Sequence, residues 1–301
     1  MTALWILVSS FCSAGILACI QCLGQTLAFL DIAFVEFAFV LAVTTLLMIV
    51  QNTSFRTHIW KLHFQRSVLG LGVVITQIIT VTHMPVAAAQ TLQYTSPLFV
   101  ATFVTLSSLR KKEQINWRLL AAIAFAFAGI CVMFHPSTRS FSAVYVIFGL
   151  VCGLLTALSI LLLKRLGNKQ EPVARTVFYF HLHGTIIIGI LECFYGHLTF
   201  EQLQQLPLGL LLVLLVFGQF TRTLGWGKGH TLLGSALSFS GVVFATLIDA
   251  LIFGRIPNAY VIAGMCIIIA AAATCLVQVS KDEKRKALGQ VRFVRTNKAI
   301  E

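Results

Sequence analysis

Apolar residues in this chain fall into long runs that are separated by short polar or basic stretches. A bilayer core about 30 Å thick requires roughly 20 apolar residues for one helical crossing. Ten runs approach or reach that length, and the third and eighth are the shortest. The pattern therefore predicts ten transmembrane helices, called spans 1 to 10, at residues 3–23, 32–50, 67–81, 86–109, 117–134, 145–163, 177–194, 208–220, 232–253 and 259–279.

The composition agrees with a chain whose helices lie in a lipid bilayer. Apolar residues make up 58% of the sequence, charged residues only 11%, and the mean hydropathy is +0.90. Soluble domains are about half apolar, so a water-soluble globule is excluded. The first run lacks a basic leading segment and a small-residue cleavage site, which favours a retained span over a secretory signal.

Basic residues are unevenly distributed among the segments between the predicted spans. If the N-terminus is cytoplasmic, every Lys and Arg except Arg139 and Arg255 lies on the cytoplasmic side, with Arg66 and Arg222 placed in loops. Short cytoplasmic loops are enriched in Lys and Arg, so this distribution predicts ten spans with both termini in the cytoplasm. The net charge of +12 then reflects topology and gives no reason to expect a nucleic-acid partner.

The chain divides into two halves of similar hydropathy. Residues 87–109 can be aligned with residues 232–254, because both share small and polar residues followed by an aromatic residue and Ala-Thr. We therefore predict two five-helix repeats, at residues 1–137 and 138–280, followed by a basic cytoplasmic tail at 281–301. A repeat with an odd number of spans must insert its two copies in opposite orientations, an arrangement common in secondary transporters.

Three segments carry a resemblance to a known family. They are SPLFVATF in span 4, EPVARTVFYF entering span 7, and SFSGVVFATLIDALIFGRIP across span 9 and the following loop. With these motifs the chain resembles the EamA family of the drug/metabolite transporter superfamily over nearly all of its length to Val279. The resemblance implies a substrate cavity lined by spans 1 to 4 and 6 to 9, with spans 5 and 10 at the periphery.

The chain departs from the family pattern at three places. Glu36 stands in span 2 where relatives often carry an arginine, and Gly254-Arg255 replaces the usual Gly-Glu after span 9. The stretch TRTLGWGKG, residues 221–229, replaces an Ala-Tyr-Arg-like approach to span 9. Because of these departures, the resemblance supports the family more strongly than it supports the substrate of any relative.

Two acidic residues, Glu36 and Asp249, lie well inside predicted spans. At 1.5 Å per residue, both are roughly 6 Å from the outer ends of their helices. Charge within a membrane is costly enough to indicate a functional site, with a substrate or proton as the partner. The alternative is that each side chain reaches the interface or makes a structural hydrogen bond.

Polar residues also follow one face of span 4. Gln90, Gln93, Tyr94 and Pro97 have the spacing i, i+3, i+4 and i+7, which places them on one side of a regular helix. Pro97 breaks backbone hydrogen bonding, which is tolerated near the midplane where a helix lines a cavity. We interpret these residues as a substrate-binding stripe, with interhelical hydrogen bonding as the alternative. In span 9, Ser238 falls on one face with Asp249, and Gln77 is a weaker candidate.

No pattern for a metal, cofactor or catalytic site emerges. His181 and His183 are two residues apart and so point in different directions on a helix, which argues against a shared metal ion. Walker, GxSxG, HExxH and GxGxxG motifs are absent from the sequence. These observations argue against an ATP-driven pump or a familiar hydrolase, and we expect no cofactor, no metal and no enzyme activity.

The sequence therefore predicts an all-α polytopic membrane protein that acts as a secondary transporter. The expected cargo is a small polar organic metabolite, such as an amino acid, amine or nucleoside-like compound, moved by alternating access and exported. Expected partners are the substrate, membrane lipid and a second copy in a homodimer, in the inner cell membrane. The alternative is a membrane protein that does not transport, either an intramembrane enzyme or an accessory scaffold.

Overall fold

The computed structural model describes residues 2–24, 26–83, 92–112, 115–134, 142–254 and 256–298. Within these ranges, the side chains of Gln21, Ile78, Phe200, Asp249 and Phe253, and those at 81–83 and 279–298, are outside the description. The described residues form helices and connecting turns, with no β-strand among them. The all-α prediction is thus confirmed for this part of the chain.

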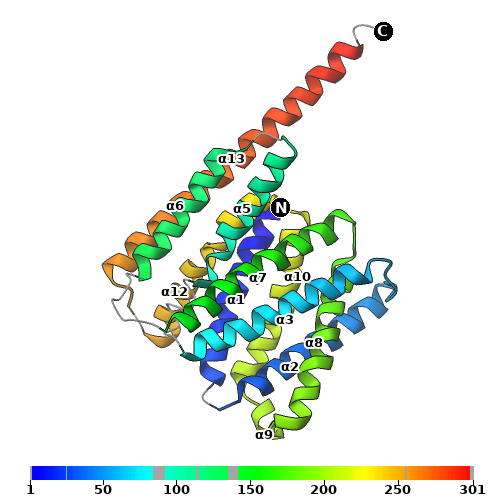
Figure 1. Ribbon diagram of the computed structural model, residues 1–301, viewed down its shortest axis with the longest axis vertical. Coiled ribbons are helices and arrows are strands. Elements are labelled where there is room, and N and C mark those ends of the chain that lie inside the picture. The colour runs from blue at the N-terminus through cyan, green and yellow to red at the C-terminus, as the bar shows by residue number, and fades with distance from the viewer. Residues whose placement is uncertain are drawn as a thin grey trace.

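The helices are numbered as in Figure 1. They are α1 (Thr2–Leu23), α2 (Phe29–Val50), α3 (Trp60–His83), α5 (Ser96–Arg110), α6 (Trp117–Phe134), α7 (Ala143–Asn168), α8 (Val173–Tyr195), α9 (Phe200–Leu203), α10 (Leu206–Lys228), α11 (Thr231–Ser238), α12 (Ser240–Phe253) and α13 (Ala259–Lys298).

Many of these helices expose apolar side chains on the outside of the molecule. Leu46, Ile147 and Ile190 are more than half exposed, at 62%, 59% and 56%. Within the described residues, seven segments are long and apolar enough to cross a membrane. They are Thr2–Ile20, Phe29–Val50, Ala143–Asn168, Val173–Tyr195, Leu206–Lys228, Thr231–Ile252 and Ala259–Gln278. The full count of ten spans stays a prediction, because α3 and α5 do not meet that description and α6 contributes a shorter apolar stretch, Trp117–Val132.

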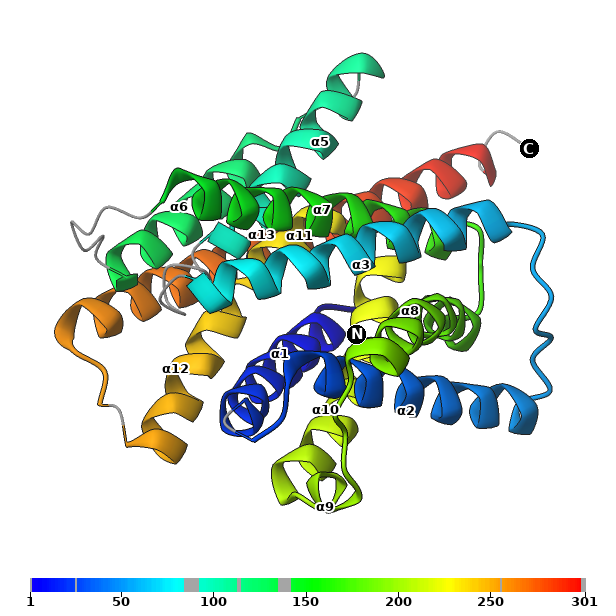
Figure 2. The same cartoon turned by 60° about the horizontal axis from the view of Figure 1, so that its bottom comes forward.

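Helices from the two halves of the chain pack against each other in pairs. The closest pairs are α1 with α10, α2 with α8, α3 with α7, and α6 with α13. Figures 1 and 2 show α3 running beside α7, and α6 beside α13 at one edge of the bundle. Each of these pairs joins a helix from before residue 137 to one from after it, so neither half folds around a core of its own.

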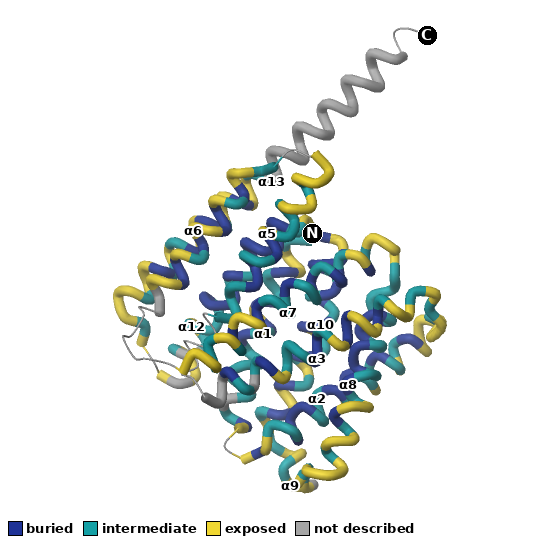
Figure 3. Tube along the Cα trace, in the orientation of Figure 1, coloured by how far each residue is buried: buried dark blue, intermediate teal, exposed yellow. Residues whose placement is uncertain are grey.

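Glycine residues allow α6 and α13 to pack closely together. A side chain added at Gly129 of α6 would meet the carbonyl oxygen of Gly264 and the side chains of Ile267 and Ile268, each at 3.0 Å. Small residues at such contacts allow helix backbones to approach closely in lipid. Figure 3 shows buried positions along α6, alternating with exposed positions that face away from the bundle. These helices correspond to the peripheral spans 5 and 10 that the resemblance implied.

Two helices are interrupted at aligned positions. The helical turn at Leu92 and Gln93 ends at Tyr94 and Thr95, and α5 begins at Ser96 with Pro97 in its first turn. In the second half, α11 ends at Ser238 and α12 begins at Ser240. The alignment of residues 87–109 with 232–254 pairs Tyr94 with Phe239, and the centroids of these two rings lie 6.2 Å apart.

The ends of α7 and α10 meet at two glycines. A Cβ atom added to Gly167 would overlap the backbone of Gly227, whereas one added to Gly227 would lie 3.6 Å from the Cα of Gly167 and 3.7 Å from the carbonyl oxygen of Leu163. The first is a clash with main-chain atoms that cannot rotate away. The second is an ordinary van der Waals contact.

We therefore expect Gly167→Ala to destabilise the protein by about 1–3 kcal/mol, the usual cost of overpacking. Gly227→Ala, the matched control, should be neutral or slightly stabilising because alanine favours helix. Thermal unfolding of both variants in detergent measures the difference. Equal unfolding temperatures for the two variants would show that the glycine contact does not constrain α7 and α10.

Candidate functional site

Two arginines lie within helices of the bundle, where the sequence analysis had placed them in loops. That assignment is wrong: α3 begins at Trp60 and contains Arg66, and α10 continues to Lys228 and contains Arg222. Each arginine is six residues from its helix end, a depth of roughly 9 Å at 1.5 Å per residue. The helices are longer than their most apolar stretches, so charged residues near those stretches were mistaken for loop residues.

Arg222 reaches toward the middle of the bundle. Its Nη2 atom donates a hydrogen bond of 2.8 Å to Oγ of Ser13, halfway along α1. Its guanidinium also interacts electrostatically with Glu36 of α2 and with Tyr94, which precedes α5. One cation thus joins groups from both halves of the chain, including the predicted site residues Glu36 and Tyr94.

Glu36 and Arg222 attract each other without touching. Among the described residues, the direct ion pair is that between Glu171 and Arg175, at 3.2 Å, and Glu36 takes no part in it. Glu36 is half-buried in α2. Opposite charges that are not in direct contact can each interact with a polar molecule bound near them.

The predicted stripe in span 4 is divided by the break before α5. The hydroxyl of Tyr94 lies 2.9 Å from the position of a Cβ atom added to Gly241 of α12, and Ser10 of α1 lies near the same point. Gln93 instead contacts Cys152 of α7. Hydrogen bonds between residues three apart tighten the helix at Thr95, which changes its angular spacing, and Gln93 and Tyr94 contact different helices.

The other predicted site residues have the following positions. Pro97 is buried in the first turn of α5. Gln77 is half-buried in α3, and Ser238 donates a 2.8 Å hydrogen bond to the carbonyl oxygen of Ser235 in its own helix. Asp249 lies in α12, but its side chain is outside the described residues, as is the whole of Gln90. For Asp249 and Gln90 the sequence-based role stays a prediction.

His181 and His183 make separate contacts, as their spacing indicated. Nδ1 of the fully buried His181 lies 2.8 Å from the carbonyl oxygen of Val177, and Nδ1 of His183 lies 2.9 Å from Oγ of Ser67. Across the described part of the chain, no group of three or more His, Cys, Asp or Glu side chains is arranged to hold a metal ion.

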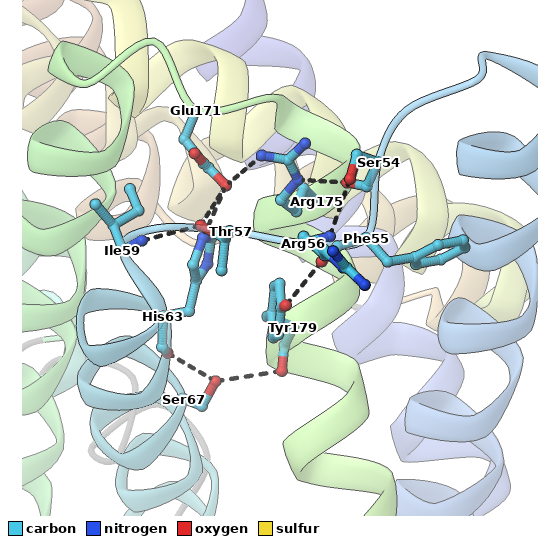
Figure 4. A network of polar contacts seen from close by, with 10 residues as sticks. All are labelled: Ser54, Phe55, Arg56, Thr57, Ile59, His63, Ser67, Glu171, Arg175 and Tyr179. Atoms are coloured by element: carbon cyan, nitrogen blue, oxygen red, sulfur yellow. Dashed lines mark hydrogen bonds and ion pairs between the residues drawn. The ribbon is translucent and has the colours of Figure 1, made fainter.

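A second polar cluster ties the loop between α2 and α3 to the start of α8 (Figure 4). Oε1 of Glu171 accepts hydrogen bonds from Thr57 at 3.1 Å, His63 at 3.1 Å and Arg175 at 3.2 Å. Arg175 also donates to the backbone carbonyl of Ser54 at 2.7 Å. We call this cluster, together with Phe55 and Tyr179, the Glu171 network.

Tyr179 completes the network by donating a 2.8 Å hydrogen bond to the carbonyl oxygen of Phe55. Ser67 lies below, donating to the carbonyl oxygen of His63 at 3.0 Å (Figure 4). A cavity of about 120 Å³ adjoins Glu171 and is also lined by Thr223 of α10, the residue after Arg222. The network therefore covers the end of the bundle on the side from which both arginines enter.

A larger surface depression of about 680 Å³ lies on the same side, between the ends of α3 and α7. Its lining includes Trp60, Lys61 and Lys169, and none of the buried charged groups reaches it. Size alone would favour this depression as the binding site. We favour the buried cluster, because opposed charges within a helix bundle require a specific explanation.

The first half of the chain matches a known family. The model of the EamA-like transporter family matches residues 1–135. The resemblance to EamA-like transporters is confirmed. This match and the apolar helices make the chain an integral membrane protein, and they point to a transporter over an enzyme.

Individual EamA-like relatives extend the comparison. The pseudopaline exporter CntI of Pseudomonas aeruginosa, strain UCBPP-PA14, is 24% identical over 208 residues, which cover 68% of this chain and 71% of the exporter. The exporter of strain PAO1 matches with the same values. A crystal structure of another protein superposes with a TM-score of 0.79 at 16% identity, covering 94% of this chain and 98% of that chain, and shows the shared fold.

Arg66 could have been recognised from an aromatic residue beyond it. Trp60, the first residue of α3, is exposed, whereas Trp226, four residues after Arg222 in α10, is buried in the core and gives no such indication. Tryptophan is enriched at the membrane interface, so a tryptophan farther from the bundle centre than an arginine indicates that the arginine lies inside. Most of the Glu171 network offers no such signal, because Thr57 and His63 are more than 100 residues from Glu171 in the sequence, and only Arg175 is near it.

The network contains one titratable group whose pKa has a clear direction. His63 precedes predicted span 3, and burial lowers the pKa of its imidazole below the ordinary value. The hydrogen bond and negative charge of Glu171 oppose this effect, while the positive charges of Arg66 and Arg175 add to it. The folded protein therefore holds His63 neutral at pH values where the unfolded chain begins to protonate it.

This shift predicts a loss of stability in acid. A histidine with a lowered pKa in the folded state stabilises the fold above its unfolded pKa of about 6.5, and that stability is lost as pH falls below it, by at most about 1.4 kcal/mol per pH unit. We expect His63→Gln to flatten the fall in unfolding temperature between about pH 7.5 and about pH 5.5. The exposed His58, changed to Gln, is the control and should keep the wild-type slope. An unchanged slope in the His63 variant would contradict the assignment.

Proposed function

We propose that this protein is a secondary transporter that exports a small polar organic metabolite by alternating access. The observation that supports this most strongly is the pair Glu36 and Arg222, whose charges face each other inside the bundle without forming an ion pair. A structural pair would gain more by direct contact, since buried charges are stable only when closely compensated. A transported polar molecule supplies the missing compensation.

The helix breaks support the same proposal. The turn at Tyr94 and Thr95 places the Tyr94 hydroxyl close to Ser10 and Gly241, within electrostatic range of the Arg222 guanidinium. Interrupted helices at the middle of a membrane bundle are tolerated where they line a cavity, and in transporters they form substrate sites.

The pairing of helices supports two inverted repeats at residues 1–137 and 138–280. In the two repeats, α1 corresponds to α7 and α3 corresponds to α10, so exchanging the repeats turns the pair α1–α10 into the pair α7–α3. The pairs α2–α8 and α6–α13 each consist of two corresponding helices and are unchanged by the exchange. All of these pairs occur. Two copies inserted in opposite senses provide the inward-open and outward-open states that alternating access needs.

The Glu171 network is the proposed gate on one side of this site. It fastens residues 54–57 to α8 and lies over the end of the bundle nearest to Arg222. The predicted topology places this side in the cytoplasm, with both chain termini. Loading from the cytoplasm then requires the network to open, which is the order of events in an exporter.

The similar proteins also support export as the direction of transport and the inner cell membrane as the location. The pseudopaline exporters of Pseudomonas aeruginosa cover two thirds of this chain, which supports outward transport of an organic metabolite across the inner cell membrane. The substrate is left at the level of chemical class, because Glu36 and residues 221–229 depart from the pattern that the EamA resemblance suggests.

The proposal is tested by reconstituting the purified protein in liposomes and screening for counterflow of pooled small metabolites. Counterflow is expected for at least one polar metabolite and requires no knowledge of the coupling ion. An absence of counterflow for every pool, with a correctly folded and inserted protein, would favour the scaffold alternative.

The role of Glu36 is tested with the same vesicles. We expect Glu36→Gln to lower the counterflow rate by about tenfold or more, because the amide keeps the size of the side chain but removes the charge opposite Arg222. Glu201→Gln in the short helix α9, where the side chain is exposed, should keep the wild-type rate. Asp249→Asn is measured alongside, and rates at several pH values complete the set. An unchanged rate and pH profile in both acidic-site variants would remove these residues from the mechanism.

A further inference from the structure

Arg66 is a buried cation with unused hydrogen-bond donors. It is 4% exposed, and its guanidinium carbon lies 4.0 Å from the centre of the Phe180 ring in α8. Two of its nitrogens, Nε and Nη1, are buried and find no hydrogen-bond partner among the residues that the structure describes. Buried donors are nearly always paired in native proteins, so this exception requires an explanation.

The charged surroundings of Arg66 do not compensate for it. The ionisable groups that interact electrostatically with Arg66 include Arg222, His63 and His181, and none of these three carries a negative charge. The ring of Phe180 attracts the cation through its face, but it accepts no hydrogen bond from Nε or Nη1 in the plane of the guanidinium. A buried charge left unpaired in a membrane bundle is strongly unfavourable.

The charges carried by α2, α3 and α10 also indicate that Arg66 lacks a negatively charged partner. Arg66 and Arg222 bring two positive charges toward the bundle interior from the same end, each roughly 9 Å from its helix end. Glu36 is the carboxylate that interacts with Arg222. One negative charge is missing from this set of three side chains.

We infer that Arg66 binds a carboxylate group of the transported metabolite. This inference rests on the proposed function and deepens it, because it restricts the substrate to small organic acids, including amino acids. A guanidinium offers planar, permanently charged donors that match the geometry of a carboxylate. Phe180 holds the plane of the guanidinium in place, and Glu36 remains available for a positive or hydrogen-bonding group of the same substrate.

The test compares acids with their neutral amides. Succinate, leucine and histidine, and the corresponding amides succinamide, leucinamide and histidinamide, are added to the purified full-length protein in detergent. Affinity is measured from the increase in unfolding temperature with ligand concentration, which detects binding without transport. Competition by the same compounds for counterflow in liposomes provides the second measurement.

We expect at least one of the three acids to bind the wild-type protein at least tenfold more tightly than its amide. Arg66→Gln should abolish that preference, and Arg66→Lys should retain part of it, because lysine keeps the charge but not the planar donors. Arg165→Gln, at the exposed end of α7, should keep the wild-type preference.

Two results would overturn the inference. One is that no acid binds the wild-type protein more tightly than its amide. This comparison uses the wild-type protein alone and so does not depend on whether the Arg66 variants fold. The other is a folded Arg66→Gln variant that keeps the preference. Counterflow of neutral or cationic metabolites alone would leave the proposed transport intact while refuting the carboxylate site. Absence of all counterflow would instead count against the proposed function.

Discussion

A charge inside a membrane protein must be compensated within the protein or by something it binds, because lipid offers no hydration. In this bundle that constraint falls on Arg222. Its hydrogen bond to Ser13 and its attraction to Glu36 link α10 to α1 and α2. Apolar packing around these helices is nondirectional, whereas the guanidinium has a required set of partners.

The turns at Tyr94 and Phe239 lie beside each other, with ring centroids 6.2 Å apart. Thr95 and Phe239 keep helical backbone angles, and hydrogen bonds between residues three apart run through both turns. Such short 3₁₀ stretches inside a helix often mark functional positions. The position of Tyr94 beside Ser10 and Gly241 shows how tightly the two halves meet there. Gly241 has no side chain, which leaves room for the tyrosine hydroxyl at this contact.

The periodicity and length of the apolar runs were sufficient to predict the helical fold, and intramembrane charge was sufficient to select Glu36. Tyr94 was also selected, because a polar aromatic residue beside a proline is unusual in an apolar helix. Arg66 and Arg222 were assigned to loops, since a run of apolar residues was taken to end at the first charge. The Glu171 network could not be predicted from the sequence, because it depends on a loop near residue 55 folding against a helix that starts at Val173.

The two polar clusters are connected through α3 and α8. His63 and Arg66 are one helical turn apart on α3, and Arg175 and Tyr179 lie on the same turns of α8 that lead to Phe180. Ser67 joins the two helices between the clusters, through the carbonyl oxygen of Tyr179 at 3.4 Å and Nδ1 of His183 at 2.9 Å. Any movement that separates the loop at residues 54–57 from α8 therefore acts on the two helices that hold Arg66 against Phe180. The Glu171 network and the buried arginine are thus held by the same two helices, α3 and α8, which is the connection that the proposed gate and the proposed substrate site need.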